Sequence, residues 1–144
     1  MPQAAGNGPK RKDAAEEAES TMEIKRIQSG ARMSQAVVHG GMAGGTAGGT
    51  VYLAGQVAAD AGADIKGQTQ SVLDKIDALL SESGASKATV LQAVIYLSDM
   101  RNFQAMNEVW DAWVDRANPP ARATVGAALA RPEFLVEIMV VAAI

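Results

Sequence analysis

Two of the charged side chains in the stretch NPPARATVGAALARPEFLVEI, at residues 118–138, lie within its apolar segments. Arg122 follows a proline pair at the start of an apolar segment, and Glu137 lies in a segment that otherwise carries no charge. A guanidinium is permanently charged, and its planar fork matches a carboxylate with two parallel hydrogen bonds. Carboxyl groups in partly apolar clefts are suited to act as general acids or bases. The pair indicates either an anion site with an adjacent carboxyl group or a structural ion pair.

A glycine-rich stretch, HGGMAGGTAGGT at residues 39–50, invites a second chemical interpretation, a phosphate-binding loop. That motif needs a lysine and a hydroxyl residue directly after its last glycine, to meet phosphate oxygens and Mg²⁺. Here Val51 follows Thr50, and no lysine occurs before Lys66. We therefore predict a flexible connection between two strands. His39, the only histidine, ends the strand before it and is expected to be a solvated loop residue rather than a catalytic one.

The composition limits the remaining chemistries. A chain of 144 residues forms one domain with its own core, and the lack of cysteine excludes disulfides and thiolate sites. With one histidine, a histidine-based zinc site within one chain is also disfavoured. The net charge of −3 argues against nucleic-acid binding. No apolar stretch reaches the roughly 18 residues of a membrane helix. We expect a cytoplasmic protein with no metal, nucleic-acid or membrane partner.

The elements that must position Arg122 and Glu137 follow from the hydrophobic pattern. Strands are predicted at 35–38, 50–58, 90–97, 121–129 and 134–144, with a further strand at 23–28 left open, and helices at 68–83 and 102–116. Pro119 and Pro120 are predicted to end the second helix. Trp110 and Trp113, at helical spacing, are predicted to be core residues rather than a ligand cage. This order predicts an α+β fold, a mixed sheet with two helices on one face.

The predicted strands carry apolar side chains on both of their faces, as the run LVEIMVVAAI at residues 135–144 illustrates. Because two helices can cover only one face of the sheet, the other face is expected to bury against a second copy of the chain. Residues 1–21 contain no apolar residue larger than alanine beyond Met1 and are predicted to be disordered. The folded domain is therefore predicted to span 22–144, and either Met1 or Met22 can be the start of translation.

Three stretches together resemble the reactive intermediate deaminase family, also called Rid or YjgF-like. They are VYLAGQVA (51–58), AVIYLSDMRNFQAMNEVWDAW (93–113) and PPARATVGAALARPEFLVEI (119–138), and the predicted helix from Gln68-Thr69-Gln70 through Leu80 belongs to the same resemblance. The resemblance covers residues 22–144. It implies a chorismate-mutase-like fold in a homotrimer whose sheets form a central barrel, with ligand clefts between neighbouring subunits.

The resemblance also implies a reaction, the hydrolysis of reactive 2-imino or enamine acids to 2-keto acids and ammonia without a cofactor. Arg122 stands where the family's arginine holds the substrate carboxylate, and Glu137 where its glutamate positions or activates the water. Gly55 matches a backbone contact beside the ligand, and Asn107 matches an asparagine near the cleft. The runner-up function is a non-catalytic, regulatory trimer that binds carboxylate metabolites in the same cleft. RNA cleavage, ascribed to relatives, lacks a basic aromatic surface in this acidic chain.

Some positions depart from the family pattern. The deaminating archetypes carry Ser-Gly-Gln where this chain has Ala54-Gly55-Gln56, so a hydroxyl is missing. They also carry a tyrosine near the start of the second strand, where this chain reads Ser34-Gln35-Ala36-Val37. The glycine-rich residues 40–50 and the first 21 residues fall outside the pattern.

Overall fold

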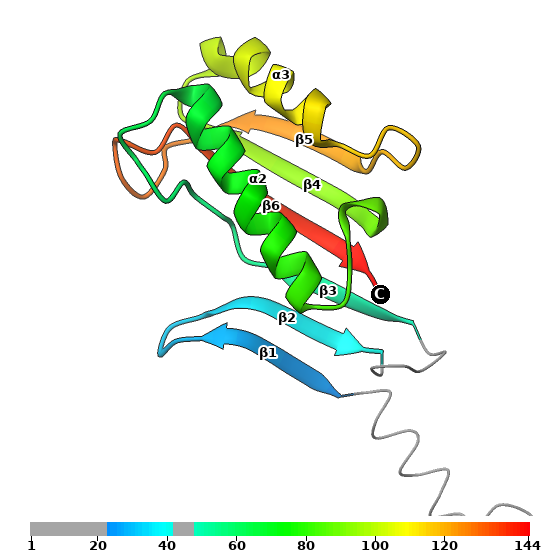
Figure 1. The fold of residues 1–144 in the computed structure, drawn as a ribbon. Coiled ribbons are helices and arrows are strands. Elements are labelled where there is room, and N and C mark those ends of the chain that lie inside the picture. The colour runs from blue at the N-terminus through cyan, green and yellow to red at the C-terminus, as the bar shows by residue number, and fades with distance from the viewer. Residues whose placement is uncertain (1–22, 42–47) are drawn as a thin grey trace, which may run out of the picture.

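The computed structural model describes residues 23–41 and 48–144, which form a six-stranded sheet with two helices on one of its faces (Figure 1). The strands are β1 (Ile24–Ser29), β2 (Ser34–Gly40), β3 (Gly49–Leu53), β4 (Val90–Leu97), β5 (Ala121–Gly126) and β6 (Val136–Ala143). The helices are α2 (Ile65–Glu82) and α3 (Phe103–Trp113), with short 3₁₀ turns η1 (Lys87–Thr89) and η2 (Met100–Asn102). The predicted mixed α+β fold is confirmed, and the strand left open at 23–28 is present as β1. The predicted disordered tail and residues 42–47 of the glycine-rich stretch lie outside the described residues.

The sheet order is β1-β2-β3-β6-β4-β5, so the C-terminal strand β6 lies inside the sheet and β5 lies at an edge. β4 and β5 pair in parallel, and the other neighbours pair antiparallel. A parallel pair needs a crossover connection, which η2 and α3 supply here. The consequence for the site is that β4 separates β5, which carries Arg122, from β6, which carries Glu137.

The core lies between the sheet and the two helices. Alternate residues of β6 are fully buried on the helix side: Val136, Ile138, Val140 and Ala142. The helix α2 meets them with a buried stripe: Val72, Leu73, Ile76, Leu79 and Leu80. Trp110 and Trp113 are buried as predicted, and the indole N–H of Trp113 donates to Asp77 Oδ2 at 3.0 Å. Burying each large apolar side chain contributes about 1.5–3 kcal/mol, so this layer fixes the strands that carry the charged residues.

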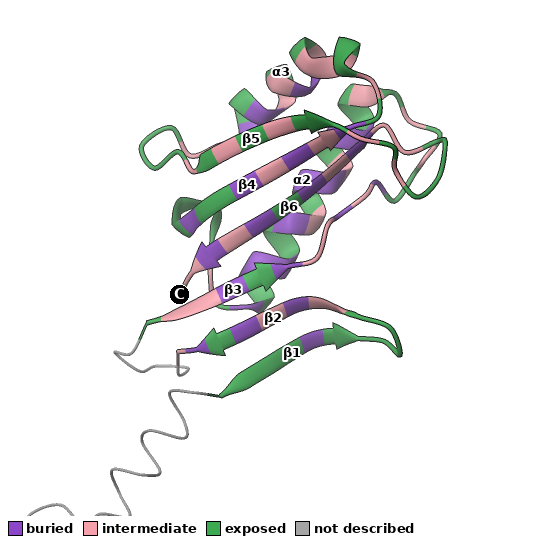
Figure 2. Cartoon of the chain, turned by 180° about the vertical axis from the view of Figure 1, so that it is seen from behind, coloured by how far each residue is buried: buried purple, intermediate pink, exposed green. Residues whose placement is uncertain are grey.

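The opposite face of the sheet is bare in the described part of the chain (Figure 2). Tyr52 is 51% exposed and Met139 is 36% exposed on this face. Val37, Val94 and Val141 lie half-buried beside them, on the strand positions that alternate with the core residues. An apolar sheet face without a covering layer is the pattern expected of strands buried on both sides in an assembly. Within residues 23–41 and 48–144, no helix is both long and apolar enough to span a membrane.

Several element ends differ from the prediction. β3 ends at Leu53 rather than at 58, and β5 ends at Gly126 rather than at 129. Both predictions were too long because apolar residues continue into loops that are tied to the core by other contacts. The helix α2 begins at Ile65, earlier than predicted, because Asp64 caps it by accepting a hydrogen bond from the amide of Gly67.

The end of α3 was predicted at Arg116, and the proline pair was expected to cause it. The structure ends α3 at Trp113 instead, because Val114 has extended backbone angles, φ −59° and ψ 140°. After it, Asp115 accepts hydrogen bonds from the amide of Ala117 and the side chain of Asn118. The turn that follows α3 thus starts before the prolines, which only restrict the entry into β5.

A buried glutamine ties the two loops that flank the candidate site to α2. The Gln68 side chain is fully buried. Its Nε2 donates to the carbonyl oxygens of Ala61, Ala63 and Glu133 at 3.2, 3.1 and 2.9 Å, and its Oε1 accepts from the amide of Leu135 at 2.9 Å. One side chain therefore holds both the loop after β3 and the loop before β6.

We expect Gln68→Leu to lower the free energy of unfolding by about 3 kcal/mol or more, because the buried backbone groups of the two loops lose their partner. Urea unfolding at one fixed protein concentration measures the change. The matched control is Gln70→Leu, since Gln70 on the exposed side of α2 bonds only to the exposed Asp74. The control is expected to cost no more than about 0.5 kcal/mol. Equal costs for the two variants would contradict the assigned role of Gln68.

Candidate functional site

Arg122 lies on the helix side of the edge strand β5. It pairs in parallel with Ala93, a core residue of β4, so both side chains point toward the helix layer. Its guanidinium carbon sits 5.2 Å from the ring centroid of Trp110 in α3. None of the ion pairs found within residues 23–41 and 48–144 includes Arg122. The guanidinium is therefore stacked on an aromatic ring, and no carboxylate of the described chain occupies its planar fork.

Two further polar side chains lie in the layer between α3 and β5. Asn107 is one turn before Trp110 on α3, and Thr124 is two residues after Arg122 on the same face of β5. Asn107 Oδ1 and Thr124 Oγ1 are buried, yet neither finds a hydrogen-bond partner within the described part of the chain. Buried polar atoms are nearly always paired, so these two mark a layer with unused polar capacity close to Arg122. Thr124 was not singled out as a site residue from the sequence, although its period-two spacing from Arg122 could have indicated it.

Glu137 lies on the other face of the sheet, half-buried. It pairs with Tyr96 of β4, which alternates with the core residues of that strand and so points to the bare face. Its carboxylate folds against Gly55: a Cβ atom built on Gly55 would stand 2.6 Å from Glu137 Oε2. No real Cβ tolerates that approach, so only glycine fits at position 55 with Glu137 in this place.

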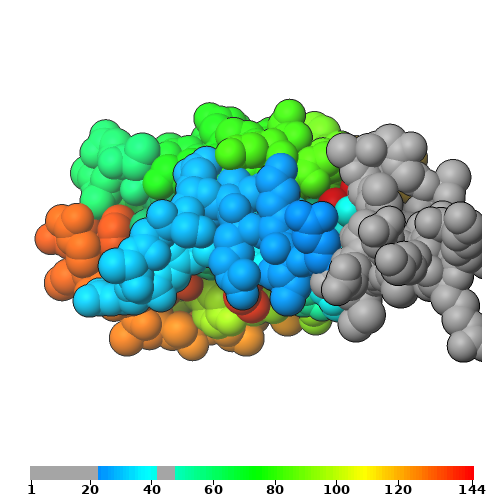
Figure 3. All heavy atoms as spheres, turned by 90° about the horizontal axis from the view of Figure 1, so that it is seen from below, coloured from blue at the N-terminus to red at the C-terminus, as the bar shows by residue number. Residues whose placement is uncertain are grey.

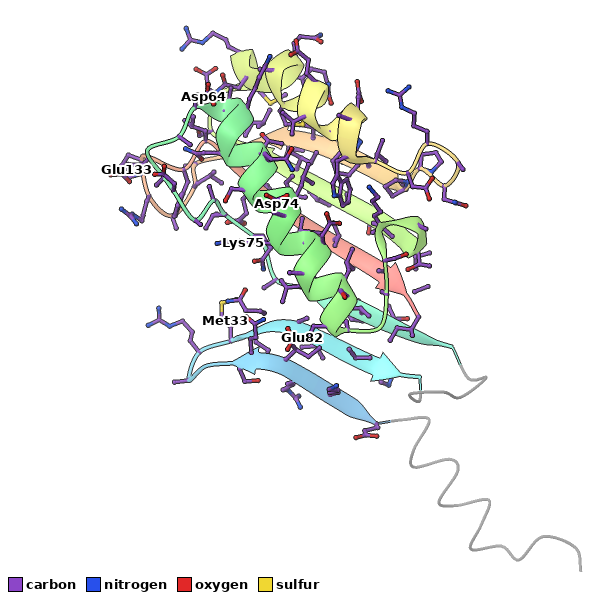
Figure 4. All side chains as sticks on the ribbon, viewed as in Figure 1. Met33, Asp64, Asp74, Lys75, Glu82 and Glu133 are labelled. Carbon is purple, nitrogen blue, oxygen red and sulfur yellow. The ribbon has the colours of Figure 1, made fainter. Side chains whose placement is uncertain are left out.

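The segment around Gly55 is held against β6 by backbone hydrogen bonds. The amide of Gln56 donates to Ile138 O at 2.9 Å, and the amide of Ile138 donates to Gln56 O at 3.1 Å. The buried Gln56 side chain donates to Gln35 Oε1 at 2.9 Å and to Ala54 O at 3.0 Å. Lys75 of α2, labelled in Figure 4, donates to Val57 O at 2.8 Å and fixes the loop further along. These hydrogen bonds hold Gly55 in place beside Glu137.

Arg122 and Glu137 are not adjacent within one chain, and none of the ion pairs among the described residues joins them. Their strands are separated by β4, and their register partners, Ala93 and Tyr96, stand three residues apart, roughly 10 Å along the strand. The two side chains also leave opposite faces of the sheet. The structure brings Gly55 against Glu137 and Trp110 against Arg122, and Asn107 lies one turn before Trp110 on α3. It does not bring the two charged residues together.

We name these two groups by their charged residue. The Arg122 half-site consists of Arg122, Thr124, Asn107 and Trp110, on the helix side of the edge strand. The Glu137 half-site consists of Glu137, Gly55, Gln56 and Tyr96, around the bare face. Each half-site has one of the two charged groups that the chemistry requires, and neither has both.

The only histidine lies far from the Glu137 half-site. His39 is exposed on β2 and pairs with Thr50, which in turn pairs with Ala143 at the other end of β6 from Glu137. It belongs to β2 itself rather than to the loop in which it was expected. Among the described residues, no His, Asp and Glu side chains gather in a group that could hold a metal ion.

The edge of the sheet formed by β1 and β2 faces the viewer in Figure 3. A hollow of about 670 Å³ lies at the β1–β2 hairpin. Its lining residues are Gln28, Ser29, Gly30, Ala31, Arg32, Met33 and Gln35. It includes neither Arg122 nor Glu137, and it connects to the Glu137 half-site only through the hydrogen bond between Gln35 and Gln56. We therefore place the candidate chemistry at the two half-sites and not in this hollow.

Two exposed carboxyl groups flank α3, the helix that covers Arg122. Hydrogen bonds from Arg101 lower the pKa of Asp99 before the helix, and hydrogen bonds from Asn118 and the amide of Ala117 lower the pKa of Asp115 after it. A lowered pKa in the folded state contributes stability above the ordinary pKa of about 4 and loses it as the pH falls through the lowered value. These hydrogen bonds therefore stabilise the two turns at neutral pH, and that contribution is lost in acid.

We expect Gly55→Ala to displace the Glu137 carboxylate while leaving the fold in place. The added methyl group would collide with the end of a flexible side chain, which moves more easily than the backbone. Any activity that depends on Glu137 is expected to fall about 100-fold, the usual size of a general acid–base contribution. The control is Gly62→Ala, whose nearest neighbour is the exposed Asp60 carboxylate at 3.2 Å, and it is expected to retain activity. Thermal melting of both variants separates displacement of Glu137 from unfolding.

The chain matches a family model described as Endoribonuclease L-PSP over residues 23–144. It is 41% identical to a RutC family protein of Haemophilus influenzae over 84% of this chain and 98% of that protein. It is 42% identical to the RutC family protein YoaB of Escherichia coli over 85% of this chain and 100% of that protein. A crystal structure of a YjgF family member from Neisseria meningitidis shares 44% identity, with a TM-score of 0.77 over 85% of this chain and 95% of that one. The sequence, the six-stranded sheet with two helices and these relatives agree: the chain belongs to the Rid/YjgF-like family.

Proposed function

We propose that this protein hydrolyses reactive 2-imino or enamine acids to 2-keto acids and ammonia, at sites shared between neighbouring chains of a homotrimer. The observation that carries the proposal is the division of the site. Arg122 and Glu137 lie on opposite faces of one sheet, so a second copy of the chain is the simplest source of the missing group for each half-site. Membership of the Rid/YjgF-like family supports the same arrangement.

The chemistry follows from the two charged groups. Arg122 binds the substrate carboxylate with its planar fork and draws electron density from the neighbouring C=N carbon. A water oxygen forms a bond to that carbon while the Glu137 carboxylate of the adjacent chain accepts a proton from the water. Glu137 returns that proton to the nitrogen, which gives a tetrahedral carbinolamine. Glu137 then transfers the hydroxyl proton to the amino group while the C–N bond breaks and the C=O bond forms, so that ammonia departs and a 2-keto acid remains. Each step is proton transfer and hydrolysis, which these side chains can perform themselves.

The bare face of the sheet supports the assembly. Tyr52, Met139 and Val141 form an apolar surface next to Glu137, so a chain that packs on this face would bury the Glu137 half-site at a subunit boundary. Three sheets that meet by this face would form the central barrel of the proposed trimer.

We expect the protein to sediment with three times the 14.9 kDa mass of one chain. Met139→Glu places a charge on the apolar face and is expected to dissociate the assembly and abolish activity, because burying an unpaired charge costs several kcal/mol. Ala112→Glu adds the same charge on the exposed side of α3 and is expected to change neither property. Sedimentation equilibrium at micromolar concentration measures the masses. A monomeric wild type would contradict both the assembly and the shared site.

The activity is tested with a 2-imino acid that an amino acid oxidase generates in the assay. The wild type is expected to accelerate loss of the imine and release of ammonia, and Arg122→Ala is expected to do neither. If the wild type binds pyruvate without accelerating imine loss, the deaminase proposal fails.

That outcome would favour the second candidate, a non-catalytic trimer that binds carboxylate metabolites and regulates a partner. One observation supports this alternative: Ala54, half-buried next to Gly55, brings no hydroxyl to the Glu137 half-site. RNA cleavage, which the description of the family model suggests, is not proposed because the net charge of −3 offers no general attraction for phosphates.

A further inference from the structure

The environment of Arg122 contains a feature that the proposed reaction does not by itself explain. Arg122 is half-buried, and an arginine withdrawn from water usually neutralises its charge with a carboxylate, but here its partner is an indole ring. Trp110 is only 5% exposed and stands 5.2 Å from the guanidinium carbon. The ring is covered by the arginine and the core, so it offers no free surface to a substrate.

The stack leaves the hydrogen-bonding edge of the guanidinium free. The indole side chain has an N–H donor but no acceptor, so it does not occupy the guanidinium N–H donors, and none of the ion pairs among the described residues includes Arg122. A carboxylate partner would instead occupy those donors and compete with the carboxylate of a substrate. Trp110 can therefore stabilise the charge and fix the orientation of Arg122 without using its binding capacity.

Trp110 packs against a second buried tryptophan, Trp113. Its ring lies 5.2 Å from the ring of Trp113, tilted by 50°. Trp113 donates its indole N–H to Asp77 Oδ2 of α2 at 3.0 Å. Lys87 Nζ lies 5.8 Å from the centroid of the Trp113 ring. The series Asp77, Trp113, Trp110 and Arg122 thus connects α2 through α3 to the edge strand β5. The orientation of the guanidinium is determined by the core and not by solvent-exposed contacts.

We propose that Trp110 is a positioning residue for carboxylate recognition: by stacking on the guanidinium it holds the fork of Arg122 open and preoriented for the substrate. This inference rests on the proposed function, because it assumes that Arg122 binds the carboxylate. Preorganisation of a binding group raises affinity by removing the ordering cost from the binding step. The effect belongs to binding, so loss of the stack raises KM and leaves kcat nearly unchanged.

The first test concerns the stack itself and uses the unliganded wild-type protein. The ring current of Trp110 is expected to shift the Nε–H resonance of Arg122 upfield in the NMR spectrum. The shift is expected to persist in Trp110→Phe and to disappear in Trp110→Leu. An unshifted Arg122 resonance in the wild type would overturn the inference without any variant or substrate.

The second test concerns function and compares two neighbouring tryptophans. Trp110→Leu is expected to weaken pyruvate binding about 3- to 30-fold, and Trp110→Phe, which retains an aromatic face, is expected to restore most of it. Trp113→Phe is the control, because it keeps an aromatic ring against Trp110 and leaves the ring beside Arg122 in place. It is expected to change binding by about twofold or less.

The outcomes separate this inference from the proposed function. If the wild type binds no 2-keto acid and hydrolyses no imine, the proposed function fails, whatever the resonance of Arg122 shows. If the wild type is active but folded Trp110→Leu binds as tightly as the wild type, the positioning role is wrong and the proposed function stands. A fall in kcat with unchanged KM would also overturn the positioning role, because it would place the effect of Trp110 in the chemical step.

Discussion

Mixing two inactive variants is expected to restore about a quarter of the wild-type activity per site, because each site takes its arginine and its glutamate from different chains. Arg122→Ala removes the carboxylate grip and Glu137→Gln removes the proton acceptor, so each variant alone is expected to retain about 1% of the activity or less. In a randomly mixed trimer, a site is intact when one chain supplies Arg122 and its neighbour supplies Glu137. Those two choices coincide at about one site in four when the variants are present equally.

The geometry within one chain makes this result decisive. Arg122 and Glu137 leave opposite faces of the sheet and stand on strands separated by β4. The variants are unfolded together in urea, refolded together, and assayed for imine loss; the control is the same mixture combined without unfolding, which keeps the chains in separate trimers. If the two residues acted in the same chain, every chain in the mixture would lack one of them. Activity that stays at the level of the single variants would therefore refute the shared site.

The identity of most elements was predictable from the chain because their patterns are local. The continuous apolar run around Glu137 predicted β6, and helical spacing of apolar residues predicted α2 and α3. The ends were less predictable, since they depend on side chains that pair at a distance. Gln68, for example, fixes the loops before α2 and before β6 with four hydrogen bonds, and nothing in its neighbours along the chain indicates those partners.

The residue types of the candidate site were predictable, but their arrangement was not. Arg122 and Glu137 belong to strands that follow one another in the chain, but the sequence does not indicate the order of these strands in the sheet. The parallel strand β4 lies between them, and only the pairing register decides which face each side chain leaves. Likewise, spacing identified Trp110 as a core residue, but the contact with Arg122 depends on how α3 crosses β5.

The second large effect concerns the separate roles of the two charged residues. Arg122→Lys keeps the charge but loses the planar fork and the flat surface that stacks on Trp110. Losing a charge-assisted contact costs about 1.5–3 kcal/mol, so pyruvate is expected to bind roughly ten- to a hundredfold more weakly. Glu137→Gln keeps the shape and hydrogen bonding of the side chain but removes its basicity. It is expected to slow imine hydrolysis about 100-fold while leaving pyruvate binding within about threefold.

The matched controls are the same substitutions in the loop before β6. Arg131 and Glu133 are exposed and pair with each other at 3.5 Å, so Arg131→Lys and Glu133→Gln test the chemical change without the site. Both are expected to leave binding, turnover and melting temperature nearly unchanged. The measurements are calorimetric titration with pyruvate and the rate of imine loss, together with thermal melting of each variant.

The pattern of losses in binding, turnover and stability distinguishes a deaminase site from a structural ion pair. If Arg122 and Glu137 formed a structural ion pair between chains, breaking it from either side would leave the other charge buried and unpaired. Both variants would then lose stability and binding together, because the cost of an unpaired buried charge falls on the fold. A deaminase instead requires that binding be lost with Arg122 and turnover with Glu137, each at nearly constant stability. The Glu137 carboxylate beside Gly55 has no cation partner among the described residues, and the Arg122 guanidinium beside Trp110 has no carboxylate partner there. Both observations favour the pattern expected of a deaminase.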